Sequence, residues 1–120
     1  MKVAVSATGR GLDALVEPRF GRAPYFVVVD TATGQWEVLE NRAGLDAVQG
    51  AGIQTAKRIA QLGAQAVITG NVGPKAFSAL QAAGVKVYSG AAGTVREALE
   101  QLRAEQLVLL DGANVEGRWA

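Results

Sequence analysis

The sequence predicts a single α/β domain in which helices cover both faces of a five-stranded mixed sheet. Short apolar runs typical of buried strands occur at residues 2–7, 25–30, 66–69 and 85–88. Segments with the apolar spacing of amphipathic helices separate the later runs, and glycine lies near their ends. The chain has 120 residues, of which 49% are hydrophobic, and this is enough for one domain with its own core.

The first three expected strands precede any helix. Lys2–Ala7 is rich in valine and alanine, and Tyr25–Asp30 is aromatic and β-branched up to its final aspartate. Residues 8–24 between them are rich in glycine, proline and charge and are expected to form a loop. Residues 31–34 end in glycine, as a hairpin turn does, and residues 35–41 alternate in polarity. We therefore expect the three strands to be antiparallel neighbours.

Three helices are expected after an irregular linker at residues 42–49. The first has apolar residues at helical spacing from Ile53 and ends near Gly63. Pro74 suits the first turn of the second helix. The third is introduced by the capping-box sequence of residues 94–97, in which a threonine and a glutamate can satisfy each other's backbone donors.

Strands are expected to alternate with these helices. Residues 66–69 are short and apolar and lie between glycines, which predicts a central strand buried on both faces. Residues 85–88 form the next strand, and residues 107–110 are expected to be a last short strand or a packed tail. We assign the domain to residues 1–110 and a C-terminal tail to residues 111–120. Within the tail, residues 112–120 are expected to be frayed, although Trp119 could dock.

The predicted order of elements is β-β-β-α-β-α-β-α, which is a ribonuclease H-like arrangement. Because crossovers through a helix are right-handed, the last two strands should lie parallel to their neighbours. The carboxyl ends of four strands would then meet at one edge of the sheet, where open α/β sheets bind ligands. The glycine-rich loops at residues 6–22, 49–53, 69–75 and 89–94 would lie there, and three of them open helices.

This edge of the sheet is the predicted binding site, and the predicted ligand is an anion. Helix N-termini present unpaired backbone donors and about half a positive charge each. Glycine at helix ends and arginine at surfaces also occur without a ligand, so a purely structural role for these residues stays open. The candidate binding residues are Ser6, Arg19, Phe20, Gly21, Arg22, Gly50, Ala51, Gly52, Ile53, Gln54, Thr69, Gly70, Asn71, Val72, Gly73, Lys75, Gly90 and Thr94. Of these, Phe20, Ile53 and Val72 are expected to exclude water from the ligand as apolar walls of the site.

The composition excludes several kinds of chemistry. The chain has no cysteine and no histidine, which removes disulfides, metal ligation by either residue type, cysteine nucleophiles and histidine bases. The first strand carries no carboxylate, so a two-metal nuclease is not expected. The net charge of +1 gives no signal for nucleic acid or an acidic membrane, and no apolar run suits a signal peptide or a membrane span. We expect a cytoplasmic monomer that is not an enzyme and binds neither nucleic acid nor membrane.

Several blocks of the sequence match one known family in order and spacing. These blocks are residues 18–26 (PRFGRAPYF), 50–54 (GAGIQ), 70–77 (GNVGPKAF), 84–88 (GVKVY) and 93–98 (GTVREA). Together they resemble the dinitrogenase iron-molybdenum cofactor biosynthesis family, which includes NifX-like proteins and the carboxyl-terminal domain of NifB-like proteins. The resemblance covers nearly the whole chain.

The resemblance implies a ribonuclease H-like fold and non-catalytic binding or carriage of an anionic metal-sulfur cluster. Family members that use histidine or cysteine near the site differ from this chain, which has neither. The chain is more similar to the small orange-protein branch, which holds a molybdenum-copper sulfide cluster without covalent ligands. The expected cargo is such a cluster or an iron-molybdenum-type cofactor precursor, and the expected protein partners are cluster-assembly or redox proteins. A sensor of a phosphorylated small molecule or nucleotide, and an interaction module for cluster-assembly proteins, stay open as alternatives.

Overall fold

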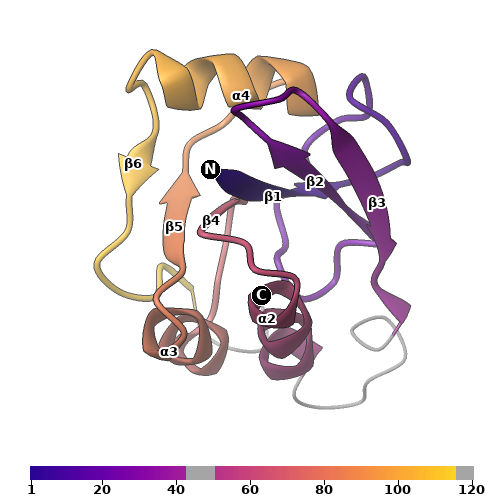
Figure 1. The fold of residues 1–120 in the computed structure, drawn as a ribbon. Coiled ribbons are helices and arrows are strands. Elements are labelled where there is room, and N and C mark those ends of the chain that lie inside the picture. Colours follow the sequence, from indigo (N-terminus) through magenta and orange to yellow (C-terminus); the bar gives the residue numbers. More distant parts are fainter. Residues whose placement is uncertain (43–50, 116–120) are drawn as a thin grey trace.

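The computed structural model describes residues 1–42 and 51–115, so most of the predicted linker, Gly50 and Trp119 lie outside the described residues. One sheet forms the middle layer of the molecule (Figure 1). Its strands are β1 (Lys2–Ala7), β2 (Tyr25–Asp30), β3 (Trp36–Glu40), β4 (Ala66–Ile68), β5 (Lys86–Ser89) and β6 (Val108–Leu109). The described helices are α2 (Ala51–Gln61), α3 (Pro74–Ala82) and α4 (Val95–Arg103).

The sheet has six strands in the order β3-β2-β1-β4-β5-β6, so the prediction of five strands was wrong. The additional strand is β6, which pairs antiparallel with the outer edge of β5 through Tyr88↔Leu109 and Ser89↔Val108. Both residues of β6 are exposed. A strand of two exposed residues shows neither alternation nor a buried run, and this is why the sequence left residues 107–110 undecided between a strand and a tail.

The rest of the strand arrangement agrees with the sequence. The strands β1, β2 and β3 are antiparallel neighbours, with Val5 opposite Val27 and Val27 opposite Val38. The strand β4 lies between β1 and β5 and is parallel to both, and all three of its residues are buried. The prediction of a central strand at this position is therefore confirmed.

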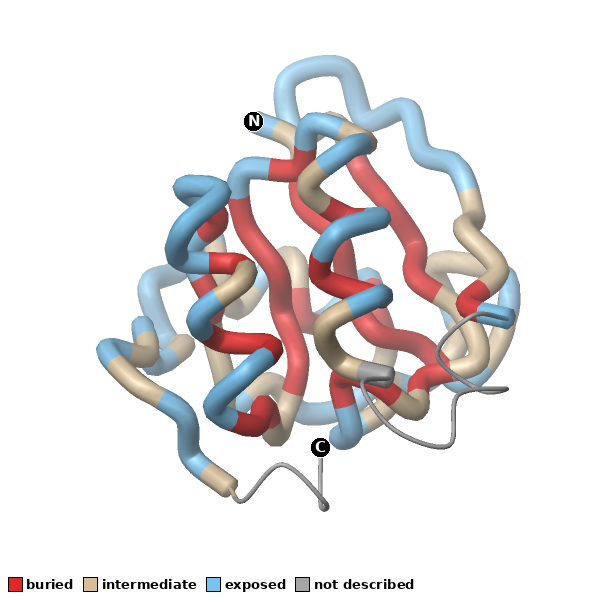
Figure 2. The backbone as a smooth tube through the Cα atoms, turned by 90° about the horizontal axis from the view of Figure 1, so that it is seen from below, coloured by how far each residue is buried: buried red, intermediate tan, exposed pale blue. Residues whose placement is uncertain are grey.

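Helices cover both faces of the sheet, and each face has its own core. Figure 1 shows α2 and α3 on one face and α4 on the other, and Figure 2 shows buried strands behind helices that are buried along one side. Ile59 and Leu80 belong to the core under α2 and α3, whereas Val5 and Ala98 belong to the core under α4. Fully burying an Ile or Leu side chain contributes about 1.5–3 kcal/mol. Among the described residues, no helix is long and apolar enough to cross a membrane.

The carboxyl ends of β1, β3, β4 and β5 lie at the same edge of the sheet. This follows from the pairing, because β3 is antiparallel to β2 and β2 is antiparallel to β1, while β4 and β5 run parallel to β1. Each described helix follows one of these strands, so α2, α3 and α4 all begin at this edge. The predicted meeting of strand ends and helix starts is confirmed.

Candidate anion-binding site

The carboxyl edge is crossed by the loop of residues 8–24, which we call the arm. Isolated bridges join the arm to three elements in turn, pairing Leu15 with Thr94, Val16 with Ala7, and Arg19 with Asn71. The arm thus runs from the start of α4, past the end of β1, to the loop before α3. The open crevice expected outside the strand ends is therefore occupied by the protein's own chain.

A buried hydroxyl group, itself bonded to a second buried hydroxyl, holds the arm at the middle of this edge. The Ser6 hydroxyl lies 2.6 Å from the carbonyl oxygen of Glu17 and 2.8 Å from the Thr69 hydroxyl. Ser6 and Thr69 are completely buried, so their side chains are engaged inside the protein and do not face a ligand. Gly70 lets Pro18 approach, because a Cβ at residue 70 would lie only 2.8 Å from the backbone of Pro18.

The N-terminus of α4 has no open donors. The N–H groups of Val95 and Arg96 donate to arm carbonyls, at 2.9 and 2.8 Å. Thr94 and Glu97 form the predicted capping box, in which each side chain accepts from the other residue's backbone N–H. The expectation of three open helix N-termini is corrected here, since the arm and the capping box satisfy the donors of α4. Gly90, with φ of 91°, lies in the turn before α4.

The N-termini of α2 and α3 lie side by side. A Cβ built on Gly52 in the first turn of α2 would lie 2.8 Å from the Cβ of Ala76 in the first turn of α3. Close helix packing thus explains Gly52, in keeping with the purely structural role that the sequence left open for the glycines. The two positive helix ends are brought together at one place, and this arrangement favours an anion.

The first turn of α3 keeps backbone donors that no described residue accepts. Its N-cap is Gly73, which has no side chain to cap the helix, and Pro74 follows it. The N–H group of Phe77 already donates to the carbonyl of Gly73. Among the described residues there is no acceptor for the N–H groups of Gly73, Lys75 and Ala76. Lys75 is exposed, whereas Gly73 and Ala76 are buried. These three unpaired donors are the ones nearest to a ligand at this helix end.

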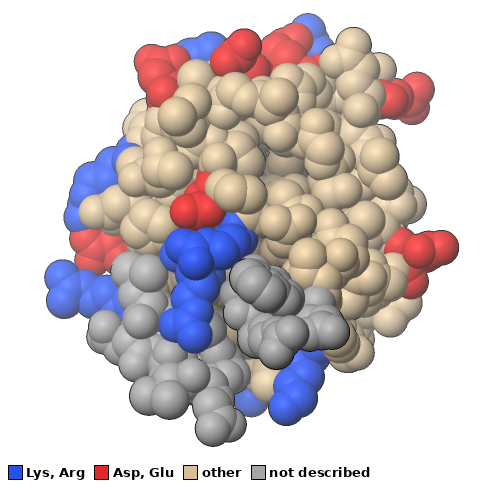
Figure 3. Space-filling model, turned by 180° about the vertical axis from the view of Figure 1, so that it is seen from behind, with Lys and Arg blue, Asp and Glu red and all other residues tan. Residues whose placement is uncertain are grey.

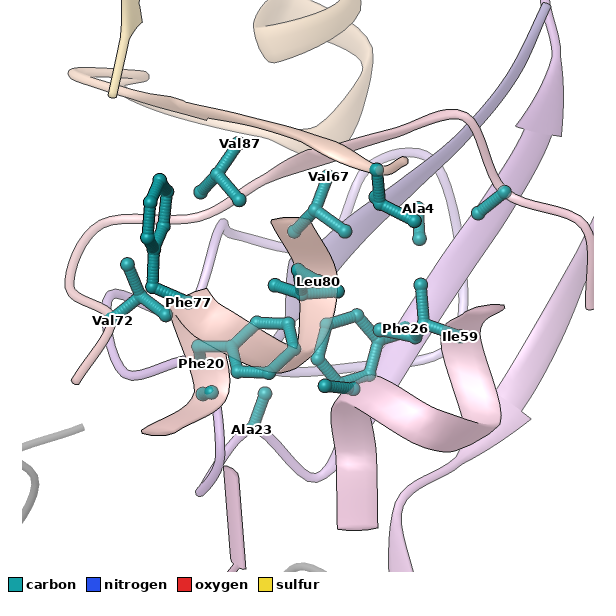
Figure 4. Packing of buried hydrophobic residues seen from close by; sticks show 14 of the residues in the cluster. Ala4, Phe20, Ala23, Phe26, Ile59, Val67, Val72, Phe77, Leu80 and Val87 are labelled. Carbon is teal, nitrogen blue, oxygen red and sulfur yellow. The ribbon is translucent and has the colours of Figure 1, made fainter. Parts of the chain in front are cut away.

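The arm carries two arginines close to this point, and an aromatic anchor holds them. The Phe20 ring is completely buried and meets the Phe26 ring edge-on, with centroids 5.4 Å apart (Figure 4). Phe20 also donates its N–H to the carbonyl of Asn71 at 3.1 Å. Arg19 on one side of Phe20 is exposed, and Arg22 is partly exposed.

Phe20 and Val72 were predicted to exclude water from the ligand as walls of the site. Both side chains are completely buried in the core under α2 and α3. The prediction is corrected for these two side chains, because they pack beneath the loops and leave only the loop backbones to face a ligand. Ile53 is half-buried and Gln54 is exposed.

Asn41 is a structural residue of this region that the sequence did not single out. Its side-chain amide donates to the carbonyls of Gly21 and Ala23 at 3.2 and 2.8 Å, and its oxygen accepts from the Thr55 hydroxyl at 2.9 Å. Asn41 is only 4% exposed. It therefore ties the end of the arm to α2. The only signal in the sequence was a polar residue directly after a strand.

A charged group ties the other part of the arm to β3. Arg10 contacts Glu40 and lies over the Tyr25 ring, with the guanidinium carbon 4.9 Å from the ring centroid. Arg42 also pairs with Glu40, at 3.3 Å. Hydrogen bonding and charge from Arg10, followed by Arg42, lower the pKa of Glu40 below its ordinary value.

Figure 3 shows that the rear face is largely uncharged and that basic side chains gather in its lower half.

The structure thus divides the predicted site residues. One group lies around the first turns of α2 and α3, Ser6 and Thr69 are buried at the middle of the edge, and Gly90 and Thr94 lie on the α4 side. Gly50 lies outside the described residues, as does the side chain of Ala51. The first group consists of Arg19, Gly21, Arg22, Gly52, Ile53, Gln54, Gly70, Asn71, Gly73 and Lys75.

An apolar groove lies elsewhere, beside α4. Its volume is about 780 Å³, and Val29, Leu99 and Leu102 are among its lining residues, none of which belongs to the predicted site. Its arginines are already paired, Arg96 with Asp13 and Arg103 with Glu100. The groove offers no unpaired cation to an anionic ligand.

Comparison with known proteins identifies one matching family and several similar proteins. The family described as dinitrogenase iron-molybdenum cofactor matches residues 1–105. The chain is 49% identical to the apo form of the orange protein from Desulfovibrio gigas, with a TM-score of 0.92, covering 95% of this chain and 96% of that one. It is 38% identical to a putative NifB protein from Thermotoga, with a TM-score of 0.84, covering 97% and 98% of the two chains.

A protein of Methanocaldococcus jannaschii described as uncharacterised is 32% identical over 103 residues, and the match covers 83% of each chain. The family match includes every described helix, the arm, and the first five strands. The chain therefore belongs to the dinitrogenase iron-molybdenum cofactor family.

Proposed function

We propose that the protein binds or carries an anionic metal-sulfur cluster as cargo at the place where α2 and α3 begin. The observation that carries this proposal is the contact between the two helix N-termini at Gly52 and Ala76, next to the first-turn donors of α3. Each helix end supplies about half a positive charge. Lys75 and Arg19 are exposed beside these donors and supply full charges.

The residues present suit a sulfide-rich anion that is held without covalent bonds. Backbone N–H groups and guanidinium groups donate hydrogen bonds to an anion. The chain has no histidine or cysteine to ligate a metal, and the described residues contain no group of three or more acidic residues that could do so. Membership of the family supports a cargo related to the iron-molybdenum cofactor, and the similarity to the orange protein supports testing a molybdenum-copper sulfide cluster first. The proposed role is carriage and not catalysis.

The test is a titration of the full chain with tetrathiomolybdate and copper(I), followed by visible absorbance after removal of unbound metal. Lys75→Ala and Arg19→Ala should each weaken binding about five- to tenfold, since each removes one solvent-screened charge. Lys86→Ala and Arg103→Ala are the matched controls. Lys86 begins β5 at the opposite edge of the sheet, and Arg103 ends α4.

Binding should weaken with added salt and stay constant near neutral pH, because no histidine titrates there. Equal losses from all four variants, or no loss from Lys75→Ala and Arg19→Ala, would place the site elsewhere. Thermal stabilisation by a nucleoside triphosphate, with none by the cluster, would favour the sensor of a phosphorylated ligand instead.

A further inference from the structure

The segment after β6 returns to the loop that leads into α3. Residues 111–115, which we call the strap, follow Leu110, and the Leu110 N–H donates to the carbonyl of Val87 at 2.8 Å. Leu110 also packs against the core under α2 and α3. The strap is thus anchored at its beginning.

Asn114 fastens the strap to the loop by three hydrogen bonds. The side-chain oxygen accepts from the Val72 N–H at 2.8 Å, and the side-chain nitrogen donates to the Gly70 carbonyl at 2.9 Å. The Asn114 backbone N–H donates to the Val72 carbonyl at 3.2 Å. One side chain therefore satisfies polar groups of the loop directly before Gly73, the N-cap of α3.

The position of the Asn114 oxygen matters because Val72 precedes the first-turn donors of α3. An anion bound at this helix end would compete for the same kind of contact, an acceptor atom on a backbone N–H. The strap is also weakly covered, since Asp111, Ala113 and Asn114 are exposed. The bond to Gly70 is exposed and the bond to Val72 is partly buried. Water can replace the protein partner in the exposed bond at low cost, and opening of the strap then brings water to the other.

We propose that the strap is a displaceable cover of the cargo site, in which Asn114 occupies the Val72 N–H until the cargo takes that donor. This inference rests on the proposed function. In the closed form the strap reduces the fraction of molecules that are competent to bind, so it lowers the apparent affinity and slows loading. Release of Asn114 is the step that makes the loop before α3 fully available.

The test compares the unaltered 120-residue chain with its Asn114→Ala variant, using tetrathiomolybdate and copper(I) as the probe. The variant should bind about tenfold more tightly and load faster, because breaking the strap contacts no longer opposes binding. Gln106→Ala removes an exposed amide on the turn before β6 and should leave both quantities unchanged. A nuclear magnetic resonance spectrum provides a second reading of the unaltered protein, in which loading should shift the Asn114 side-chain amide signals to those of an asparagine whose amide is hydrogen-bonded only to water.

The outcomes separate the two proposals. Equal or weaker binding by Asn114→Ala, or Asn114 signals that do not move on loading, would contradict the proposal that the strap covers the site. Neither result would contradict the proposed function. Failure of both proteins to bind the probe would contradict both the proposed function and the proposal that the strap covers the site. Tighter and faster binding by Asn114→Ala, with no change in Gln106→Ala, would support the proposal that the strap covers the site.

Discussion

Replacing Asn41 by alanine should lower the free energy of unfolding by about 2–4 kcal/mol. The residue is 4% exposed, and its side chain makes hydrogen bonds to Gly21, Ala23 and Thr55. A net value of about 0.5–1.5 kcal/mol for each of three lost bonds gives roughly 1.5–4.5 kcal/mol. Thr55 has a further interaction of its own, which places the expectation below the upper limit.

The assay is urea unfolding of the full chain followed by circular dichroism, with a thermal scan beside it. For a domain of this size the midpoint temperature should fall by roughly 8–16 °C, at about 4 °C for each kcal/mol. Gln35→Ala is the control, because Gln35 is an exposed amide after the hairpin turn and should change stability by less than about 0.5 kcal/mol.

A double-mutant cycle checks the reasoning more closely. Thr55→Val removes the hydroxyl that donates to Asn41 and nearly preserves the side chain's shape. Because the two side chains share a hydrogen bond, the double variant should lose less stability than the sum of the single losses. A loss below about 0.5 kcal/mol for Asn41→Ala, or strictly additive losses in the cycle, would refute the view that Asn41 ties the arm to α2.

Two further predictions concern the arm. Gly70→Ala should destabilise the protein by about 1–3 kcal/mol because its Cβ would meet the Pro18 backbone at 2.8 Å, whereas Gly11→Ala, with open space around its Cβ, should be nearly neutral in the same urea unfolding assay. The lowered pKa of Glu40 means that its pairing with Arg10 is fully present above the ordinary value of 4.5 and is lost as the pH falls through the lower folded value. Stability measured from pH 6 to about pH 3 should therefore fall less steeply in Glu40→Gln than in the unaltered protein, and identical pH profiles would contradict this.

Elements whose signal is local were predictable. The strands β1 and β2, the central strand β4 and the capping box of α4 follow from short-range patterns of polarity and from a spacing of three residues. The meeting of strand ends and helix starts at one edge also followed, since the order of elements and the right-handed crossover leave few topologies. The lack of histidine and cysteine is a property of composition alone, and it excludes ligation or nucleophilic chemistry by either residue type.

Tertiary structure decided which groups at that edge are occupied or buried by the rest of the chain. The arm closes the N-terminus of α4 through backbone groups, and backbone hydrogen bonds between distant segments leave no pattern in the side chains. Phe20 is a core anchor because Phe26 and the loop before α3 surround it, although its arginine neighbours suggested a ligand wall. Asn41 and Asn114 are two of many polar residues in the sequence.

The sequence by itself thus determined five of the six strands, the helices and the edge at which a ligand could meet them, because these depend on periodicity and on the small number of allowed topologies. Tertiary structure decided which distant segments lie at each helix start. At Gly52 two helices approach so closely that no Cβ fits, whereas at Thr94 the arm and the capping box occupy the donors. In the sequence, both positions are simply the start of a helix. They differ in the structure because α3 packs against the start of α2, whereas the arm accepts hydrogen bonds from the start of α4.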